Sequence, residues 1–182
     1  MSFGSEEKSR FIRYLEDLVQ RRDRGALAHL RRGLGKAPGT VMEMHRYVVP
    51  FLPKERAWTE DSHYLVAALF AYWHQGKDAV APSPPANLGT SLAQMATDAN
   101  EDSLDRRFTA LLKSHPDDLP MYLRQAVGLL KSQDVPVNWQ QLMKDISNWY
   151  REDNLVQRRW AQAFWGRRTA ADTTPETEHT SE

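Results

Sequence analysis

The chain of 182 residues contains no cysteine. This absence excludes disulfide bonds, thiolate metal sites and a cysteine nucleophile, and it fits a protein of a reducing compartment. The sequence also has no apolar run near the ~20 residues that a membrane helix needs, and its first ten residues are too charged for a signal peptide. We therefore expect a cytoplasmic protein with no membrane partner.

The chain also lacks an excess of either charge: its 24 basic and 24 acidic side chains give a formal net charge of zero. Four of the acidic residues lie from Ala170 onward, in a segment without lysine or arginine. The rest of the chain has 24 basic and 20 acidic side chains, a net charge of +4. The final segment lacks apolar periodicity, so we expect an acidic, disordered tail at 167–182.

A phosphate-binding loop is suggested by Gly35-Lys36, but its other elements are absent. That motif needs an earlier glycine where this chain has Leu30, and a serine or threonine where it has Ala37. The same stretch is typical of a helix end, because Gly33 or Gly35 can supply a left-handed cap. Nucleotide hydrolysis is therefore not predicted here.

Catalytic and metal-binding patterns are equally scarce. The six histidines form no i,i+4 pair and no His-Glu-x-x-His motif, and no serine lies in a Gly-x-Ser-x-Gly elbow. The acidic stretch His115-Pro116-Asp117-Asp118 is better explained as a turn and helix start, with an aspartate cap and Pro120 in the first turn. We expect no enzyme, no metal and no cofactor.

Apolar side chains recur with a helical period along nearly the whole chain, and no strand is predicted. Asp23 can cap the second expected helix. Thr40 and Glu43 are spaced as a capping box for a third helix that ends at Pro50. The predicted fold class is all-α, a two-lobed helical bundle protein of about nine helices. The expected helices are Ser5–Arg22, Asp23 through Leu30, Thr40–Pro50, Thr59–Gly76, Thr90–Thr97, Ser103–Ser114, Leu119–Gln133, Asn138–Tyr150 and Asn154–Trp165.

One internal segment, GKDAVAPSPPANLG, has three prolines among small residues and is typical of a linker. It divides the chain into an N-terminal helical lobe at 1–76, a Pro-rich linker at 77–87 and a C-terminal helical lobe at 88–166. The tail at 167–182 follows the second lobe.

The basic residues of the second lobe recur in pairs seven residues apart, so each pair shares one helix face. The pairs are Arg106/Lys113, Arg124/Lys131 and Lys144/Arg151. Spacing alone is weak evidence, because solvated helix faces carry charge by chance. Near the end, arginines and aromatics alternate in NWYREDNLVQRRWAQAFWGRR, a mixture that can bind single strands. We interpret Trp160 and Phe164 as core residues, whereas Trp165 fits either role.

The order and spacing of several segments resemble the CasB family. The segments are LAHLRRG, HRYVVPF, NLGTSLAQM, SLDRRFTALLKS, LPMYLRQAVGLLKS and VNWQQLMKDISNWY, and the resemblance spans roughly Tyr14 to Trp165. CasB is the small subunit of the type I-E CRISPR surveillance complex, Cascade. No single motif is specific, and the acidic tail lies outside the resemblance.

The resemblance implies a two-lobed helical subunit with no catalytic centre. It implies that two copies lie head to tail and touch the backbone and large subunits of Cascade. It also implies a basic surface that holds the guide RNA–target DNA duplex and helps stabilise the displaced strand in the R-loop. Such a surface neutralises phosphates without reading sequence, because base pairing reads the sequence.

The candidate nucleic-acid-binding residues follow from this resemblance and from the helical pairs. Gln125 stands where the family often has a second basic residue, which weakens the surface at that point. By position, the candidates are Arg31, Arg32, Arg46, Arg106, Arg107, Arg124, Lys144 and Arg151, and the pair spacing adds Lys131.

Two alternatives to nucleic-acid binding stay open at this level. The chain can be a purely architectural helical adaptor that binds only proteins through apolar surfaces. An enzyme of unknown type would need a cluster of carboxylates or histidines in the folded chain.

Overall fold

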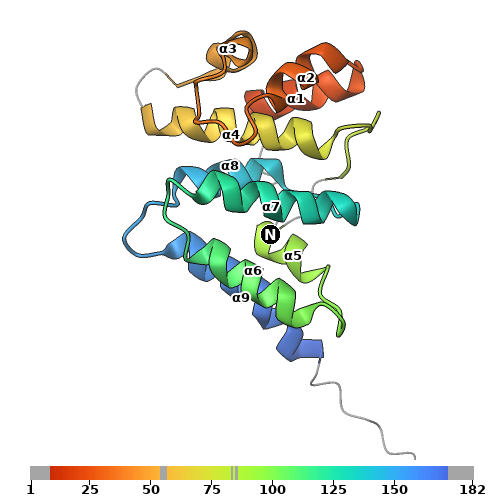
Figure 1. Cartoon of the computed structure of the whole chain (residues 1–182), viewed down its shortest axis with the longest axis vertical. Coiled ribbons are helices and arrows are strands. Elements are labelled where there is room, and N and C mark those ends of the chain that lie inside the picture. Colours follow the sequence, from red (N-terminus) through yellow and green to blue (C-terminus); the bar gives the residue numbers. More distant parts are fainter. Residues whose placement is uncertain (1–8, 54–56, 83, 85, 172–182) are drawn as a thin grey trace, which may run out of the picture.

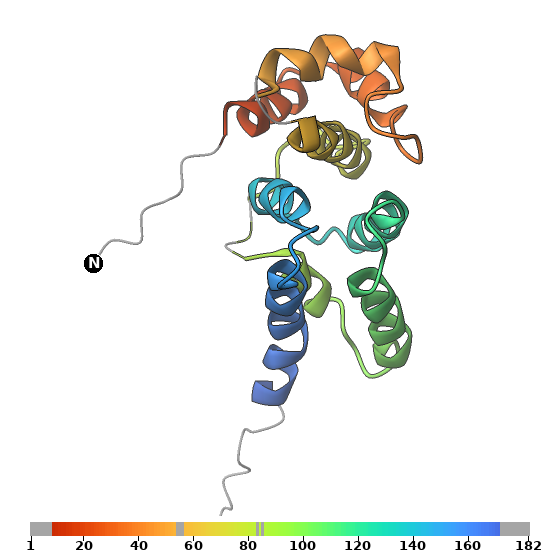
Figure 2. The same ribbon diagram turned by 90° about the vertical axis from the view of Figure 1, so that its left-hand side faces the viewer.

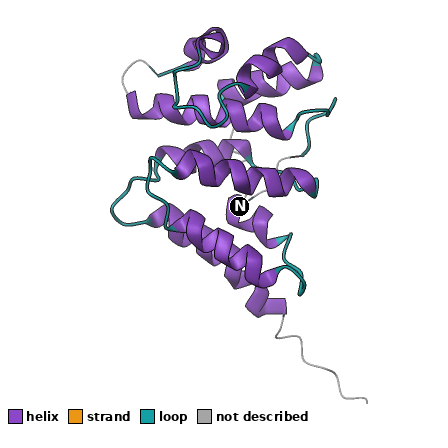
Figure 3. Ribbon diagram, viewed as in Figure 1, coloured by secondary structure: helices purple, strands orange, loops and turns teal. Residues whose placement is uncertain are grey.

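The computed structural model describes residues 9–53, 57–82, 84 and 86–171. Nine α-helices, one short 3₁₀ helix and no strand are found among these residues, which confirms the predicted all-α class (Figure 3). The helices are α1 (Arg10–Gln20), α2 (Arg24–Arg31), α3 (Met42–Val48), η1 (Val49–Phe51), α4 (Ala57–Trp73), α5 (Leu88–Ala93), α6 (Glu101–Leu112), α7 (Leu119–Ser132), α8 (Trp139–Ser147) and α9 (Leu155–Ala171).

The helices stack in successive layers along the long axis of the molecule (Figure 1). Helices α1, α2 and α3 cover one side of α4, and α7 and α8 lie against its other side. Helices α5, α6 and α9 form the far end, beyond α7 and α8 (Figure 2). Helix α4 is therefore the element through which the two halves of the chain meet.

The central position of α4 follows from its composition, because it is apolar on all sides rather than on one stripe. Residues Val66 to Ala71 of this helix are each at most 1% exposed. At its C-terminal end, the Trp73 indole Nε1 donates a hydrogen bond to the Val135 carbonyl, 3.0 Å away. One continuous core runs from α1 through α4 to α9.

Helices α5 and α9 cross closely in the second half of the chain. A Cβ atom on Gly89 of α5 would lie 2.3 Å from the Trp160 carbonyl oxygen of α9, so only glycine permits this approach. Trp160 and Phe164 are fully buried, as predicted for core residues. Phe164 stacks on Phe108 of α6, with ring centroids 4.1 Å apart, and this contact joins α9 to α6.

Side-chain caps start several helices, and the sequence predicts one of them. Asp23 accepts a hydrogen bond from the Ala26 amide at 2.9 Å and caps α2 as expected. Ser9, Asn87 and Asn138 cap α1, α5 and α8 in the same manner. These bonds satisfy amides that have no partner within the helix.

The capping box predicted at Thr40 and Glu43 is wrong. Helix α3 has Val41 at its N-cap and no side-chain cap. The Thr40 hydroxyl instead donates to the Ala37 carbonyl at 2.7 Å, and Glu43 forms an ion pair with Arg32. The loop between α2 and α3 thus uses the hydroxyl and the carboxylate for its own contacts.

Other predicted boundaries shift by a few residues. Helix α3 ends at Val48, and Pro50 lies in η1. Asp118 is at the N-cap of α7 without a side-chain hydrogen bond, and a proline lies in the first turn as predicted. Helix α9 continues to Ala171. Residues 5–8 of the first expected helix, two residues of the expected linker (83 and 85) and 172–182 of the expected tail lie outside the described residues.

Candidate nucleic-acid interface

Two of the predicted basic residues come from distant parts of the sequence and lie close together. Arg31 ends α2, and Lys131 lies near the end of α7. Partial burial lowers the pKa of Lys131, and the positive charges of Arg31 and Lys77 lower it further. These three cations therefore share one region, where they repel one another.

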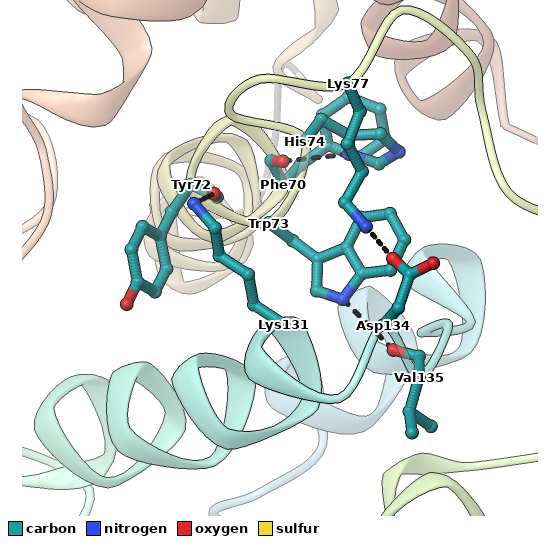
Figure 4. Close-up of polar contacts among 8 residues, drawn as sticks. All are labelled: Phe70, Tyr72, Trp73, His74, Lys77, Lys131, Asp134 and Val135. Atoms are coloured by element: carbon teal, nitrogen blue, oxygen red, sulfur yellow. Dashed lines mark hydrogen bonds and ion pairs between the residues drawn. The ribbon is translucent and has the colours of Figure 1, made fainter.

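Lys131 also has a structural role at the end of α4 (Figure 4). Its ammonium group donates hydrogen bonds to the Tyr72 carbonyl at 2.9 Å and to the Gln75 side chain at 3.2 Å. It lies 4.7 Å from the centroid of the Tyr72 ring. A cation at this position donates a hydrogen bond to a carbonyl at the helix C-terminus and interacts favourably with the negative end of the helix dipole.

Lys77 belongs to the same region, although the sequence did not single it out. It forms an ion pair with Asp134, and its ammonium group lies 3.7 Å from the Trp73 ring centroid (Figure 4). The helical pair spacing misses Lys77 because this residue follows the left-handed Gly76 in a loop. Only the packing of α4 against α7 brings it near Lys131.

Arg124 lies nearer the N-terminal end of α7 than Lys131 does, and it is exposed. A Cβ atom on Gly35 would be 3.2 Å from the Arg124 Nη1 atom, so the guanidinium lies against the loop after α2. Arg124 and Lys131 are seven residues apart and therefore lie along one side of α7. We refer to Arg31, Lys77, Arg124 and Lys131 as the α2–α7 basic cluster.

Arg106 and Arg107 are both exposed on α6. Arg107 lines a small crevice together with Tyr122 and Gln125 of α7. Gln125 directly follows Arg124 in the sequence. Neither arginine forms an ion pair with a residue that the structure describes. Their charge is therefore not neutralised by a described carboxylate.

Two further candidates are held by acidic neighbours. Arg32 pairs with Glu43, and hydrogen bonds from the backbone and from Arg32 lower the pKa of Glu43. Arg151 donates two hydrogen bonds to Asp153, at 2.8 and 3.2 Å, and this contact lowers the pKa of Asp153 to about 2. A phosphate at either position would compete with an existing carboxylate.

The remaining candidates lie apart from the cluster. Arg46 is exposed on α3, 5.5 Å from the centroid of the Tyr47 ring. Helix α4 lies between α3 and α7 (Figure 1). Lys144 is half-buried on α8, and its carbonyl accepts a hydrogen bond from Asn148 at 2.7 Å.

Arg22 and Arg24 extend the basic region beyond the predicted residues. With Arg31, Lys77 and Asp78 they line a hollow of about 280 Å³ between the end of α1 and the end of α4. Asp78 lies 3.7 Å from Arg22 and 4.0 Å from Arg24, so one carboxylate faces two guanidinium groups. A clue in the sequence was the run RRDR, which places three arginines around one helix cap.

The chemistry available to this surface is that of fixed positive charge. Among residues 9–53, 57–82, 84 and 86–171, no group of three or more histidines and carboxylates is placed to hold a metal ion. His74, which lines the basic hollow, is buried, and burial lowers its pKa to about 4. The Trp165 ring packs edge-on against the Phe108 ring, with ring centroids 5.2 Å apart.

None of the helices in the described residues has both the length and the apolar content to span a membrane.

Comparison with known proteins gives consistent matches over most of the chain. Residues 26–165 match the family model of the CRISPR-associated protein Cse2. The chain is 33% identical over 162 residues to a CRISPR-associated protein Cse2 of Thermus thermophilus, covering 86% of this chain and 89% of that protein.

Solved structures give the same result. A crystal structure of a Cse2-family protein from Thermus thermophilus superposes with a TM-score of 0.74 at 32% identity, covering 86% of this chain and 96% of that one. A chain of a CRISPR RNA-guided surveillance complex in a pre-nicking state matches with a TM-score of 0.76 at 29% identity, covering 91% and 96% of the two chains.

Proposed function

Because the chain belongs to the CRISPR-associated Cse2 family, whose members include CasB proteins, we propose that it is a non-catalytic subunit of an RNA-guided surveillance complex of the Cascade type. In this proposal its basic surface binds the backbones of guide RNA and target DNA. It thereby stabilises the R-loop together with the displaced strand. Its protein partners are the backbone and large subunits and a second copy of itself, placed head to tail.

The observation that carries the nucleic-acid part is the α2–α7 basic cluster. Arg31 and Lys131 are 100 residues apart in the sequence but are close enough for Arg31 to lower the pKa of Lys131. Like charges held together cost free energy, which phosphate groups would relieve. Arg124, Arg106 and Arg107 extend this charge along α7 and α6 without ion pairs to described residues.

A local basic region is sufficient for this role. Binding to nucleic acid does not require a high net charge of the whole protein, because each lysine or arginine near a phosphate releases condensed counterions locally. Such contacts position the duplex and carry no sequence information. Base pairing between guide and target supplies the specificity.

The test is reversal of four charges, Arg31, Arg106, Arg107 and Arg124, to glutamate in the assembled complex. We expect R-loops on matched targets to have shorter lifetimes, and binding to weaken equally for different target sequences. The salt dependence of binding should become less steep, by up to ~0.9 in log–log slope for each duplex phosphate that is no longer neutralised. R-loop lifetime is measured at two salt concentrations.

The control reverses Arg10 and Arg13, two exposed arginines in the first half of α1, a helix that α4 separates from α7 (Figure 1). Assembly of each variant is checked by gel filtration before binding is measured. If the four-charge variant assembles and its R-loops last as long as those of the control, the subunit acts as an architectural adaptor that binds only proteins.

A further inference from the structure

A cavity of about 530 Å³ lies between the two halves of the chain. Its walls come from the loop between α2 and α3, from α4, from the start of α7 and from the end of α8. Its apolar floor includes Leu65, Leu119 and Ile146. This volume and this lining fall in the range of cavities that bind ligands or inserted side chains.

One end of the cavity is acidic. Asp61, Asp117 and Tyr150 line it, and the partial burial of Tyr150 and the charges of both aspartates raise the pKa of Tyr150. Burial and the neighbouring Glu60 also raise the pKa of Asp61. Asp61 forms no ion pair with a described residue, and Asp117 has only His115, at 3.4 Å. Neither carboxylate has an arginine or lysine partner in the described chain.

Two large apolar side chains stand exposed at the same opening. Tyr150 is 58% exposed and Met121 is 50% exposed, and both line the cavity. Tyr150 also lines a second hollow of about 410 Å³ with Ser147, Asn148 and Arg151. Tyr150 therefore forms a wall of both hollows, at the end of α8.

We propose that the acidic end of this cavity binds an arginine side chain presented by a loop of a different protein chain. A guanidinium group can bind both carboxylates and stack on the Tyr150 ring, while its aliphatic stem contacts Met121. The second hollow, which Tyr150 also lines, offers room for a flanking residue of the loop. The proposal rests on the proposed function for its partner, a neighbouring subunit of the complex.

The charges favour a protein loop over nucleic acid at this position. Two carboxylates repel phosphates, whereas they attract a guanidinium group. The cationic residues of the cavity, Lys36 and Arg124, lie toward the loop that contains Gly35. Neither Lys36 nor Arg124 contributes to the raised pKa values of Asp61 and Tyr150. The two carboxylates and the two cations thus line different parts of the cavity.

The first test uses the isolated full-length protein and N-acetyl-arginine amide, followed by amide chemical shifts in NMR. We expect shifts around Tyr150 and Ser62, with roughly fivefold weaker binding of the neutral analogue N-acetyl-citrulline amide. Asp61→Asn and Asp117→Asn should each weaken arginine binding roughly threefold, and Asp98→Asn, an exposed aspartate elsewhere, should not. Equal binding of the arginine and citrulline probes, or shifts confined to other surfaces, would overturn the proposal.

The second test uses the assembled complex with a benzoylphenylalanine photo-cross-linker in place of Met121. We expect cross-links to an arginine-containing segment of another subunit, reduced at least about threefold when Asp61 and Asp117 are both changed to asparagine. Cross-links to nucleic acid, to a second copy of this chain or to a segment without arginine, or none, count against the proposal. Failure of the wild-type chain to assemble with the other subunits would instead refute the proposed function. The first test, on the isolated protein, would then still decide whether the cavity binds arginine.

Discussion

The Lys131 ammonium group donates a hydrogen bond to the Tyr72 carbonyl across the junction of α7 and α4, at 2.9 Å. The second half of the chain thus satisfies a carbonyl at the end of the first half's central helix. Nearby, the Trp73 indole donates to the Val135 carbonyl just after α7. A residue predicted only to contact nucleic acid therefore also holds the fold together.

Changing Lys131 to methionine should lower the free energy of unfolding by about 1 kcal/mol, because the change removes the bond to Tyr72 and the contact with its ring while most of the aliphatic stem is kept. Urea denaturation followed by tryptophan fluorescence measures the effect. The matched control is Arg124→Met on the same side of α7, which should change stability by less than ~0.5 kcal/mol. Equal effects of the two changes would contradict a structural role for Lys131.

Replacing Gly89 by alanine should destabilise the protein by about 3 kcal/mol, the cost of overpacking a close helix crossing. The added methyl group would lie 2.3 Å from the Trp160 carbonyl oxygen, so α5 must move away from α9. Gly166→Ala on α9 is the control, since no atom lies within 4 Å of its added Cβ, and helix propensity predicts an unchanged or slightly raised stability. Thermal unfolding by circular dichroism distinguishes the two. Similar melting temperatures for both variants would show that the crossing can relax.

The helices could be predicted because their signals are local. The apolar period and the caps depend on residues three or four apart, and Asp23 caps α2 as the sequence indicates. The capping box at Thr40 failed because the same hydroxyl can bond backward to the Ala37 carbonyl, and spacing does not choose between the two. The role of Gly89 depends on how two helices cross, which no local pattern contains.

The candidate interface was predictable in part. Arg31, Arg124 and Lys131 were all candidates, but their proximity depends on α4 packing between the halves of the chain. Lys77 was missed because loop residues have no periodic pattern. The ion pair between Arg151 and Asp153 could have been suspected from their spacing of two, but its bidentate geometry depends on the turn before α9.

The Trp160 indole donates a hydrogen bond to the buried Asp145 carboxylate at 2.7 Å. Changing Trp160 to phenylalanine should therefore cost about 3 kcal/mol, because poorer packing adds to the loss of one of the two donors, Trp160 and Gln141, that the described residues offer to this buried carboxylate. Trp149→Phe removes the same ring volume without this hydrogen bond and should cost at least ~1 kcal/mol less. Urea denaturation at pH 7 compares them. Equal losses would mean that packing alone explains the change.

The environment of His74 favours its neutral form. The ring is 1% exposed, stacks on Phe70 with centroids 4.0 Å apart, and donates through Nδ1 to the Phe70 carbonyl at 2.9 Å (Figure 4). Burial is the main cause of the pKa near 4. The charge of Lys77 lowers the pKa further, and the hydrogen bond to the Phe70 carbonyl opposes both effects by raising it. In the unfolded chain the pKa of this histidine returns to about 6.5.

Between pH 6.5 and 4 the unfolded chain therefore binds a proton at His74 that the folded protein does not bind. Stability rises with pH wherever the unfolded state binds more protons, so the contribution of His74 is complete above about pH 6.5 and is lost as the pH falls toward 4. The pKa difference predicts a loss of about 3 kcal/mol over this window. His74→Phe removes the titration and keeps an aromatic ring, so its free energy of unfolding should fall less than that of the wild type between about pH 7.5 and 4.5. Parallel curves for wild type and His74→Phe, from urea titrations at several pH values, would show that this ring is protonated as readily in the folded protein as in the unfolded chain.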